Sequence, residues 1–91
     1  MDGFDYARVA YIISTKTDEI SEAILTDLSR GATALKASGL YKNEDREVLM
    51  TVVPLKDLVV LQDMIKQIDE DAFIIIGNVH EVLGRGFRRR I

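Results

Sequence analysis

The residue types best suited to ligand chemistry lie in two short glycine-containing stretches. The first is residues 39–46, with the sequence GLYKNEDR. Gly39 gives the backbone freedom to turn, Tyr41 offers an aromatic face that can stack on a ring, and Arg46 can donate charge-assisted hydrogen bonds to an anion. The pattern indicates a contact with a small anionic metabolite or nucleotide. The same residues also suit a plain turn that contacts another copy of the chain.

The second stretch is residues 81–87, EVLGRGF, which begins with Glu81. Gly84 and Gly86 flank Arg85, so an anion could approach the backbone closely while the guanidinium binds it. The stretch is not a dinucleotide fingerprint, because it lacks the third glycine and the strand-to-helix turn of that motif. A turn with an oligomer contact is again the competing interpretation.

Catalytic and metal-binding chemistry is not indicated. The single histidine, His80, has no cysteine to pair with, and no cluster of His, Asp and Glu has metal-ligand spacing. The acidic pairs Glu44–Asp45 and Glu70–Asp71 fall in predicted turns, where we interpret them as solvated loop residues. We therefore predict no enzymatic activity, no catalytic residue, no metal and no cofactor.

Composition is typical of an ordinary single-domain globular protein. The 91 residues are 47% hydrophobic and 30% charged, which is enough for one core. No stretch is apolar enough to span a bilayer, no signal peptide or cysteine is present, and we expect this chain to be soluble. The formal charge is −3, with eight Lys and Arg against fifteen Asp and Glu in residues 1–84 and four arginines in residues 85–90. This balance argues against nucleic-acid binding.

Hydrophobic periodicity predicts a strand and a helix in the first third of the chain. The strand covers residues 8–14, an apolar run with β-branched and aromatic members. Thr17 is the expected cap of the helix, and its first turn is acidic. The helix should end near Ser29, with Gly31 as a left-handed cap.

The remaining elements repeat this arrangement after a hairpin. A weak strand over 32–37 and a polar connection over 38–45 lead to a strong strand over 47–53. Pro54 ends that strand, because it cannot donate to a strand ladder. The last elements are a helix with Leu58, Leu61, Ile65 and Ile68 on one face and a strand over 72–76, closed by Gly77 and Asn78.

The order strand, helix, strand, strand, helix, strand predicts an α+β fold of the ferredoxin-like βαββαβ type. Right-handed crossovers in both halves give a four-stranded antiparallel sheet with two helices on one face, with strands 8–14 and 47–53 in the centre. We expect a single domain over residues 1–91, with flexible ends at 1–6 and 88–91. RNA-recognition domains share this topology but stack bases on central-strand aromatics, which the strand over 47–53 lacks.

Two helices can cover only one face of such a sheet, yet the predicted strands are apolar on both. In the first strand, Val9, Tyr11 and Ile13 alternate with Ala10 and Ile12. The pattern does not show which face meets the helices, but the other face should be buried by something outside the fold. We expect a second copy of the chain there, which makes the protein a homo-oligomer, either a trimer or a dimer.

Short motifs spread over nearly the whole chain are shared with a known bacterial family. They are EISEAI (19–24), Arg30-Gly31 with Thr33, Gly39, Tyr41, REVL (46–49), Ala72-Phe73 and, most specifically, EVLG (81–84) with GF (86–87). Through these motifs the chain resembles the soluble domain of unknown function at the C-terminus of YitT-type bacterial membrane proteins. Ala37, Lys42 and Asn43 depart from the pattern, because such domains tend to have Gly, Thr and Gly there.

The resemblance implies a fold similar to the PII-like signalling proteins. Their ferredoxin-like protomers bury the open sheet face in a trimer and bind nucleotides or other anions in clefts between subunits. It also implies that the chain is a fragment of a larger membrane protein, with an attached transmembrane region on the cytoplasmic side of the bacterial inner membrane. Residues 1–3 would then replace that preceding region.

Two functional hypotheses follow. In the first, the chain is a regulatory sensor domain that forms a homo-oligomer and binds a small anionic metabolite or nucleotide between subunits. In the second, it is a pure oligomerisation module without a ligand. The basic tail, residues 88–90, falls short of the usual cluster of four or more cations for lipid binding, so we expect a solvated tail. The ligand residues of the first hypothesis are Gly39, Tyr41, Arg46, Glu81, Gly84, Arg85 and Gly86.

Overall fold

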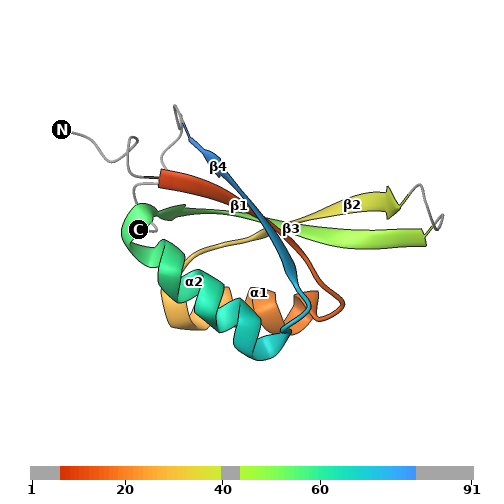
Figure 1. The fold of residues 1–91 in the computed structure, drawn as a ribbon, viewed down its shortest axis with the longest axis horizontal. Coiled ribbons are helices and arrows are strands. Elements are labelled where there is room, and N and C mark those ends of the chain that lie inside the picture. Colours follow the sequence, from red (N-terminus) through yellow and green to blue (C-terminus); the bar gives the residue numbers. More distant parts are fainter. Residues whose placement is uncertain (1–6, 40–43, 80–91) are drawn as a thin grey trace.

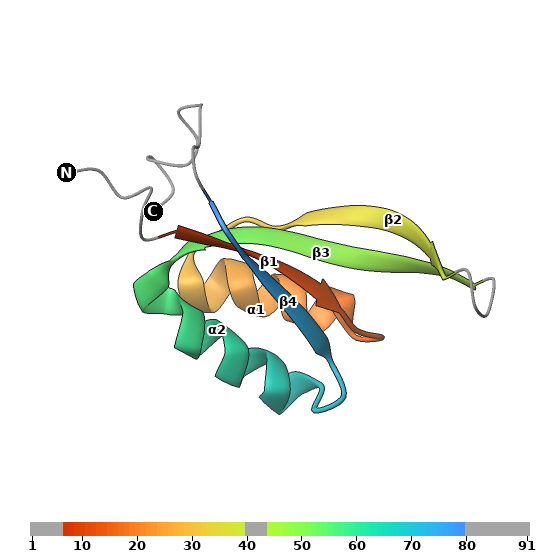
Figure 2. The same cartoon turned by 45° about the horizontal axis from the view of Figure 1, so that its top comes forward.

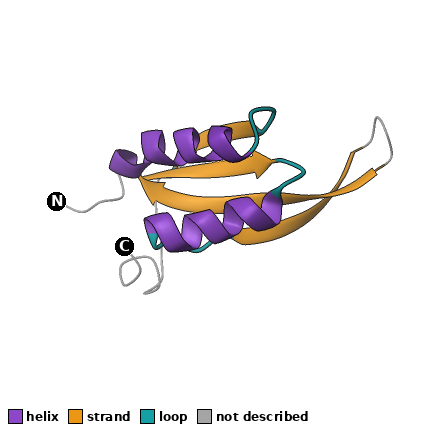
Figure 3. Ribbon diagram, turned by 90° about the horizontal axis from the view of Figure 1, so that it is seen from below, coloured by secondary structure: helices purple, strands orange, loops and turns teal. Residues whose placement is uncertain are grey.

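The computed structural model describes residues 7–39 and 44–79, which form one four-stranded sheet with two helices on one of its faces (Figures 1 and 3). The strand order is β2-β3-β1-β4, and all three pairings are antiparallel. The predicted ferredoxin-like βαββαβ fold is confirmed, including the two central strands. The elements are β1 (Ala7–Ile13), α1 (Thr17–Leu28), β2 (Thr33–Gly39), β3 (Glu44–Pro54), α2 (Leu55–Ile68) and β4 (Phe73–Asn78).

The ends of α1 differ from the prediction. Lys16 is the N-cap residue and makes no side-chain cap bond, whereas Thr17 is already helical. Its hydroxyl donates instead to Glu47 Oε1, at 2.9 Å, so a tertiary contact has replaced the expected cap. At the other end Ser29, not Gly31, takes the left-handed conformation, with φ 55°. The helix stops at Leu28, and the left-handed residue is the one that follows it directly.

Strands β2, β3 and β4 are longer than predicted, whereas β1 has its predicted length and begins and ends one residue earlier. Gly77 and Asn78 belong to β4, because they pair with Val9 and Arg8 at the start of β1. A β-carbon on Gly77 would lie 3.3 Å from Val9 Cγ1, and this close approach explains a glycine inside a strand. The β2–β3 pair extends beyond the other strands, since β1 pairs with β3 only from Val48 onward (Figure 2).

The core lies between the helices and one face of the sheet. Its residues show which sheet face the helices cover. Helix α1 contributes Ile20 and Ile24, and α2 contributes Leu61 and Ile65 from its predicted apolar face. Thr51 is also buried on this side, where its hydroxyl donates to the Gly31 carbonyl at 2.8 Å. The sheet residues of the core are Ala10 and Ile12 from β1 and Leu49 and Val53 from β3.

Candidate functional site

The sheet face opposite the helices is apolar across all four strands, and we call it the open face. Strand register aligns its side chains in rows, because residues paired across antiparallel strands point to the same side. One row joins Met50, Tyr11 and Ile75, which are consecutive partners across β3, β1 and β4. The full set is Leu35 on β2, Val48, Met50 and Val52 on β3, Val9, Tyr11 and Ile13 on β1, and Phe73 and Ile75 on β4.

Several open-face side chains are exposed to a degree that is unusual for their size. Phe73 is 63% exposed, Ile75 48% and Leu35 38%, although all three are large and apolar. An antiparallel sheet with one face on the core normally alternates apolar and polar residues, so that the outer face is polar. A continuous apolar outer face therefore marks a contact surface.

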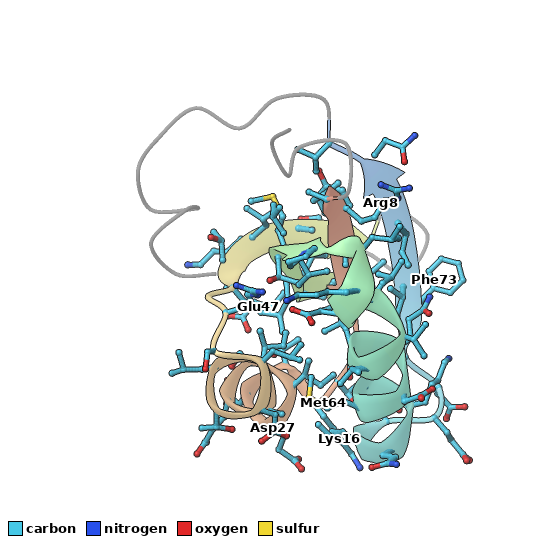
Figure 4. All side chains as sticks on the ribbon, turned by 90° about the vertical axis from the view of Figure 1, so that its left-hand side faces the viewer. Arg8, Lys16, Asp27, Glu47, Met64 and Phe73 are labelled. Carbon is cyan, nitrogen blue, oxygen red and sulfur yellow. The ribbon has the colours of Figure 1, made fainter. Side chains whose placement is uncertain are left out.

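A cleft of about 800 Å³ lies beside one corner of the open face, and we call it the end cleft. Three segments meet there: the β1–α1 connection, the first part of β3 and the α2–β4 connection. Phe73 projects outward from β4 at this corner, while Glu47 lies on the side of the sheet that faces α1 (Figure 4). The lining residues are Ile13, Ser14, Thr15, Thr17, Arg46, Glu47, Asp69, Asp71 and Phe73.

Hydrogen bonds join the two connections that border the end cleft. Ser14 Oγ donates to Asp69 Oδ2 at 2.6 Å, and it accepts from the Lys16 backbone N–H at 2.9 Å. The Asp71 N–H donates to Asp69 Oδ1 at 3.0 Å. These bonds lower the pKa of Asp69 below its ordinary value, chiefly through Ser14, with smaller contributions from Asp71 and the charge of Lys16. Asp69 is thus held as a carboxylate that fixes the cleft wall.

A Ser14→Ala substitution is expected to raise the pKa of Asp69 towards its ordinary value. Because the folded-state pKa is depressed, the contribution of Asp69 to stability is present above the unfolded pKa of about 4 and is lost as pH falls through the folded value. Carboxyl-carbon NMR titration measures the shift directly. Thr15→Ala is the matched control, since no hydrogen bond joins the Thr15 side chain to Asp69. An unchanged Asp69 titration in Ser14→Ala would contradict the assignment.

Arg46 is the one predicted ligand residue whose side chain can be placed. It pairs with Ala37 across β2 and β3, two residues before Val48, so it projects on the open-face side of the sheet. Gly39 is the last residue of β2. The other five predicted ligand residues, Tyr41, Glu81, Gly84, Arg85 and Gly86, lie outside the residues that the structure describes.

Sequence reasoning missed the hydroxyl and carboxylate residues that accompany Arg46 in the end cleft. Ser14 and Asp69 are 55 positions apart, and Thr17 and Glu47 are 30 apart, so no local motif joins them. The predicted element order could have shown that they are neighbours, because a βαββαβ chain brings the β1–α1 and α2–β4 connections to the same end of the sheet. Within residues 7–39 and 44–79, no three His, Cys, Asp or Glu side chains are placed to hold a metal ion.

A family model described as "uncharacterized protein conserved in bacteria (DUF2179)" matches residues 30–84 of the chain. The chain belongs to the DUF2179 family. This confirms the resemblance to YitT-type proteins, because the relatives of this DUF2179 chain include the UPF0750 membrane protein YitT of Bacillus subtilis. YitT is 35% identical over 75 residues, which are 82% of this chain and 27% of YitT.

Two further Bacillus subtilis relatives carry the same UPF0750 membrane-protein name. YvjA is 41% identical over 87 residues, 96% of this chain and 31% of YvjA. YpjC is 48% identical over 81 residues, 89% of this chain and 28% of YpjC. The DUF2179 chain therefore spans less than a third of each of these membrane proteins. Among its own described residues, neither helix is long and apolar enough to cross a bilayer.

Solved structures agree with the family and the fold. A DUF2179 protein from Eubacterium ventriosum is 38% identical, with a TM-score of 0.72, and covers 80% of this chain and 100% of its own. CutA from Synechococcus elongatus is 11% identical, with a TM-score of 0.59 over 93% of this chain and 89% of CutA. At that identity CutA shows a shared fold, which supports the PII-like fold class.

Proposed function

We propose that this DUF2179 chain is a regulatory sensor domain of a bacterial membrane protein, on the cytoplasmic side of the inner membrane. It assembles into a homo-oligomer through the open face and binds a small anionic metabolite or nucleotide between subunits. Ligand binding in the oligomer then alters the attached transmembrane region. The observation that carries the proposal is the apolar outer face that runs without interruption from β2 to β4.

A second copy of the chain is the partner that best fits the open face. The face is built from aliphatic and aromatic side chains, with exposed Phe73, Ile75 and Leu35 distributed over both edge strands. Such a surface suits a self-complementary contact, because each copy then buries the same apolar rows. Burial between copies also adds to the limited core of a short chain.

Arg46 supports an anionic ligand at the edge of this interface. Its position on the open-face side directs the guanidinium towards the second copy, whereas Glu47 lies on the opposite side and accepts from Thr17. An anion can therefore meet the arginine at the subunit boundary, on the other side of the sheet from the Glu47 carboxylate.

Native mass spectrometry of the gently purified chain tests the proposal, because one spectrum reports both subunit number and retained small molecules. We expect an oligomer that carries extra mass. Arg46→Ala, with or without Arg85→Ala, should lose that mass and keep the subunit number. Lys36→Ala is the matched control, since Lys36 is a cation of the same hairpin on the opposite side of the sheet. A monomer would refute the assembly, and a ligand retained after loss of both arginines would refute their role.

The alternative function is a pure oligomerisation module that holds copies of the membrane protein together. The open face is sufficient for it, and no ligand is required. An empty oligomer that shows no thermal shift with any nucleotide or phosphate compound would favour this module. Unchanged cellular activity in the arginine variants would point the same way.

A further inference from the structure

A second group of exposed apolar side chains lies on α2 and is not explained by the open face. Of the seven large apolar residues that the described chain exposes, three belong to the open face and Leu25 stands alone on α1. The other three are Leu55, Val59 and Val60, which are 41%, 64% and 52% exposed. They occupy the first two turns of α2 at helical spacing, and we call them the α2 patch.

The α2 patch lies at the end of the domain from which both chain ends leave. Pro54, directly before α2, pairs with Ala7 at the start of β1, and Asn78 at the end of β4 pairs with Arg8. Figures 1 and 2 show the start of α2, the start of β1 and the end of β4 together at one end of the sheet. Any polypeptide attached before residue 7 or after residue 79 therefore departs beside the patch.

The α2 patch has cations beside its start and one exposed carboxylate beyond it, since Asp63 lies one turn after Val59 on the same helix face. Lys56 lies within the first turn of α2 and is exposed, and Arg8 lies at the adjacent start of β1. Asp57, the acidic residue of the same turn, is held by Arg30, with 2.8 Å between Nη2 and Oδ2. The exposed carboxylate of Asp27 at this end belongs to the other helix. The opposite end, by contrast, has the acidic run of residues 69–71.

We propose that the α2 patch rests on an anionic lipid bilayer. Leu55, Val59 and Val60 enter the headgroup region, while Lys56 and Arg8 lie beside lipid phosphates. Apolar side chains next to long cationic ones are the combination that a membrane interface favours. The inference rests on the proposed function, because attachment to a transmembrane region keeps the domain near the bilayer and makes a weak surface contact effective.

Vesicle flotation tests this contact on the chain without residues 88–91, so that the basic tail cannot carry the binding. We expect binding to vesicles of phosphatidylglycerol and phosphatidylcholine at low salt, and none to phosphatidylcholine alone. The Val59→Glu/Val60→Glu double variant should reduce the bound fraction at least about fivefold, since two charges oppose both insertion and the anionic surface. Leu25→Glu, at an equally exposed site on α1, should bind like the parent.

The outcomes separate this inference from the proposed function. Equal binding by the double variant and the parent would overturn the lipid contact. Absence of parent binding to anionic vesicles would also overturn it and would assign the patch to a protein contact instead. Subunit number is measured on the same samples. An oligomer that does not bind vesicles leaves the proposed assembly intact, whereas a monomer that binds through the α2 patch supports the lipid contact and refutes the assembly.

Discussion

An Ile75→Asp substitution is expected to dissociate the oligomer into monomers while the domain stays folded. Ile75 lies on the edge strand β4 beside Tyr11 and is 48% exposed, so the new carboxylate is hydrated in the monomer. In the oligomer it would be buried against the apolar rows of a second copy, where an unpaired charge is strongly unfavourable. A loss of at least about 2 kcal/mol, which weakens association about 30-fold, is typical for a central interface residue.

Sedimentation velocity over a range of protein concentrations measures this effect. Leu25→Asp is the matched control, because Leu25 is 62% exposed on α1, away from the open face. It should keep the mass of the parent oligomer, and circular dichroism should show both variants folded. If Ile75→Asp sediments as the parent does, the open face is not the contact between copies.

The sequence was sufficient for the sheet order but not for the choice of covered face. Val9, Tyr11 and Ile13 are as apolar as Ala10 and Ile12, so periodicity alone gives no preference. The structure places Ala10, which is smaller than Val9 or Tyr11, under the helices. Its register partner on β3, the polar Thr51, is buried on the same side. Thr51 is accommodated because the Gly31 carbonyl accepts its hydroxyl, a partner that comes from a distant connection.

Helix ends and the candidate site were also hard to predict, because contacts between distant parts of the chain determine them. Thr17 has the chemistry of a cap, but its hydroxyl finds Glu47 on the sheet once the chain has folded. Arg46 could be selected from the sequence as a cation near a glycine-containing turn. Its direction depends on pairing with Ala37, because a shift of one residue would turn it to the helix side. Local patterns therefore indicated residue types, while strand register determined their neighbours.

The partly buried ion pair between Arg30 and Asp57 is expected to be the most sensitive polar contact of the monomer. Arg30 is 6% exposed, and its guanidinium joins the α1–β2 connection to the first turn of α2. Arg30→Ala would leave the Asp57 carboxylate, whose side chain is 20% exposed, without this partner. Removing one member of a fully buried pair costs about 3–5 kcal/mol, and the partial exposure of Asp57 places the expected loss at or below the lower end of that range.

Urea unfolding measures this loss, and the Ile75→Asp background keeps it separate from subunit dissociation. The informative control is the Arg30→Met/Asp57→Leu double variant, which removes both charges and keeps most of the volume. Apolar pairs often match or exceed a buried ion pair in stability, so the double variant should recover most of the loss. If it is as unstable as Arg30→Ala, the guanidinium acts through its other packing rather than through Asp57. Recovery of stability in the double variant would show instead that the loss in Arg30→Ala comes from the unpaired Asp57 carboxylate. That carboxylate lies at the same helix start as the α2 patch.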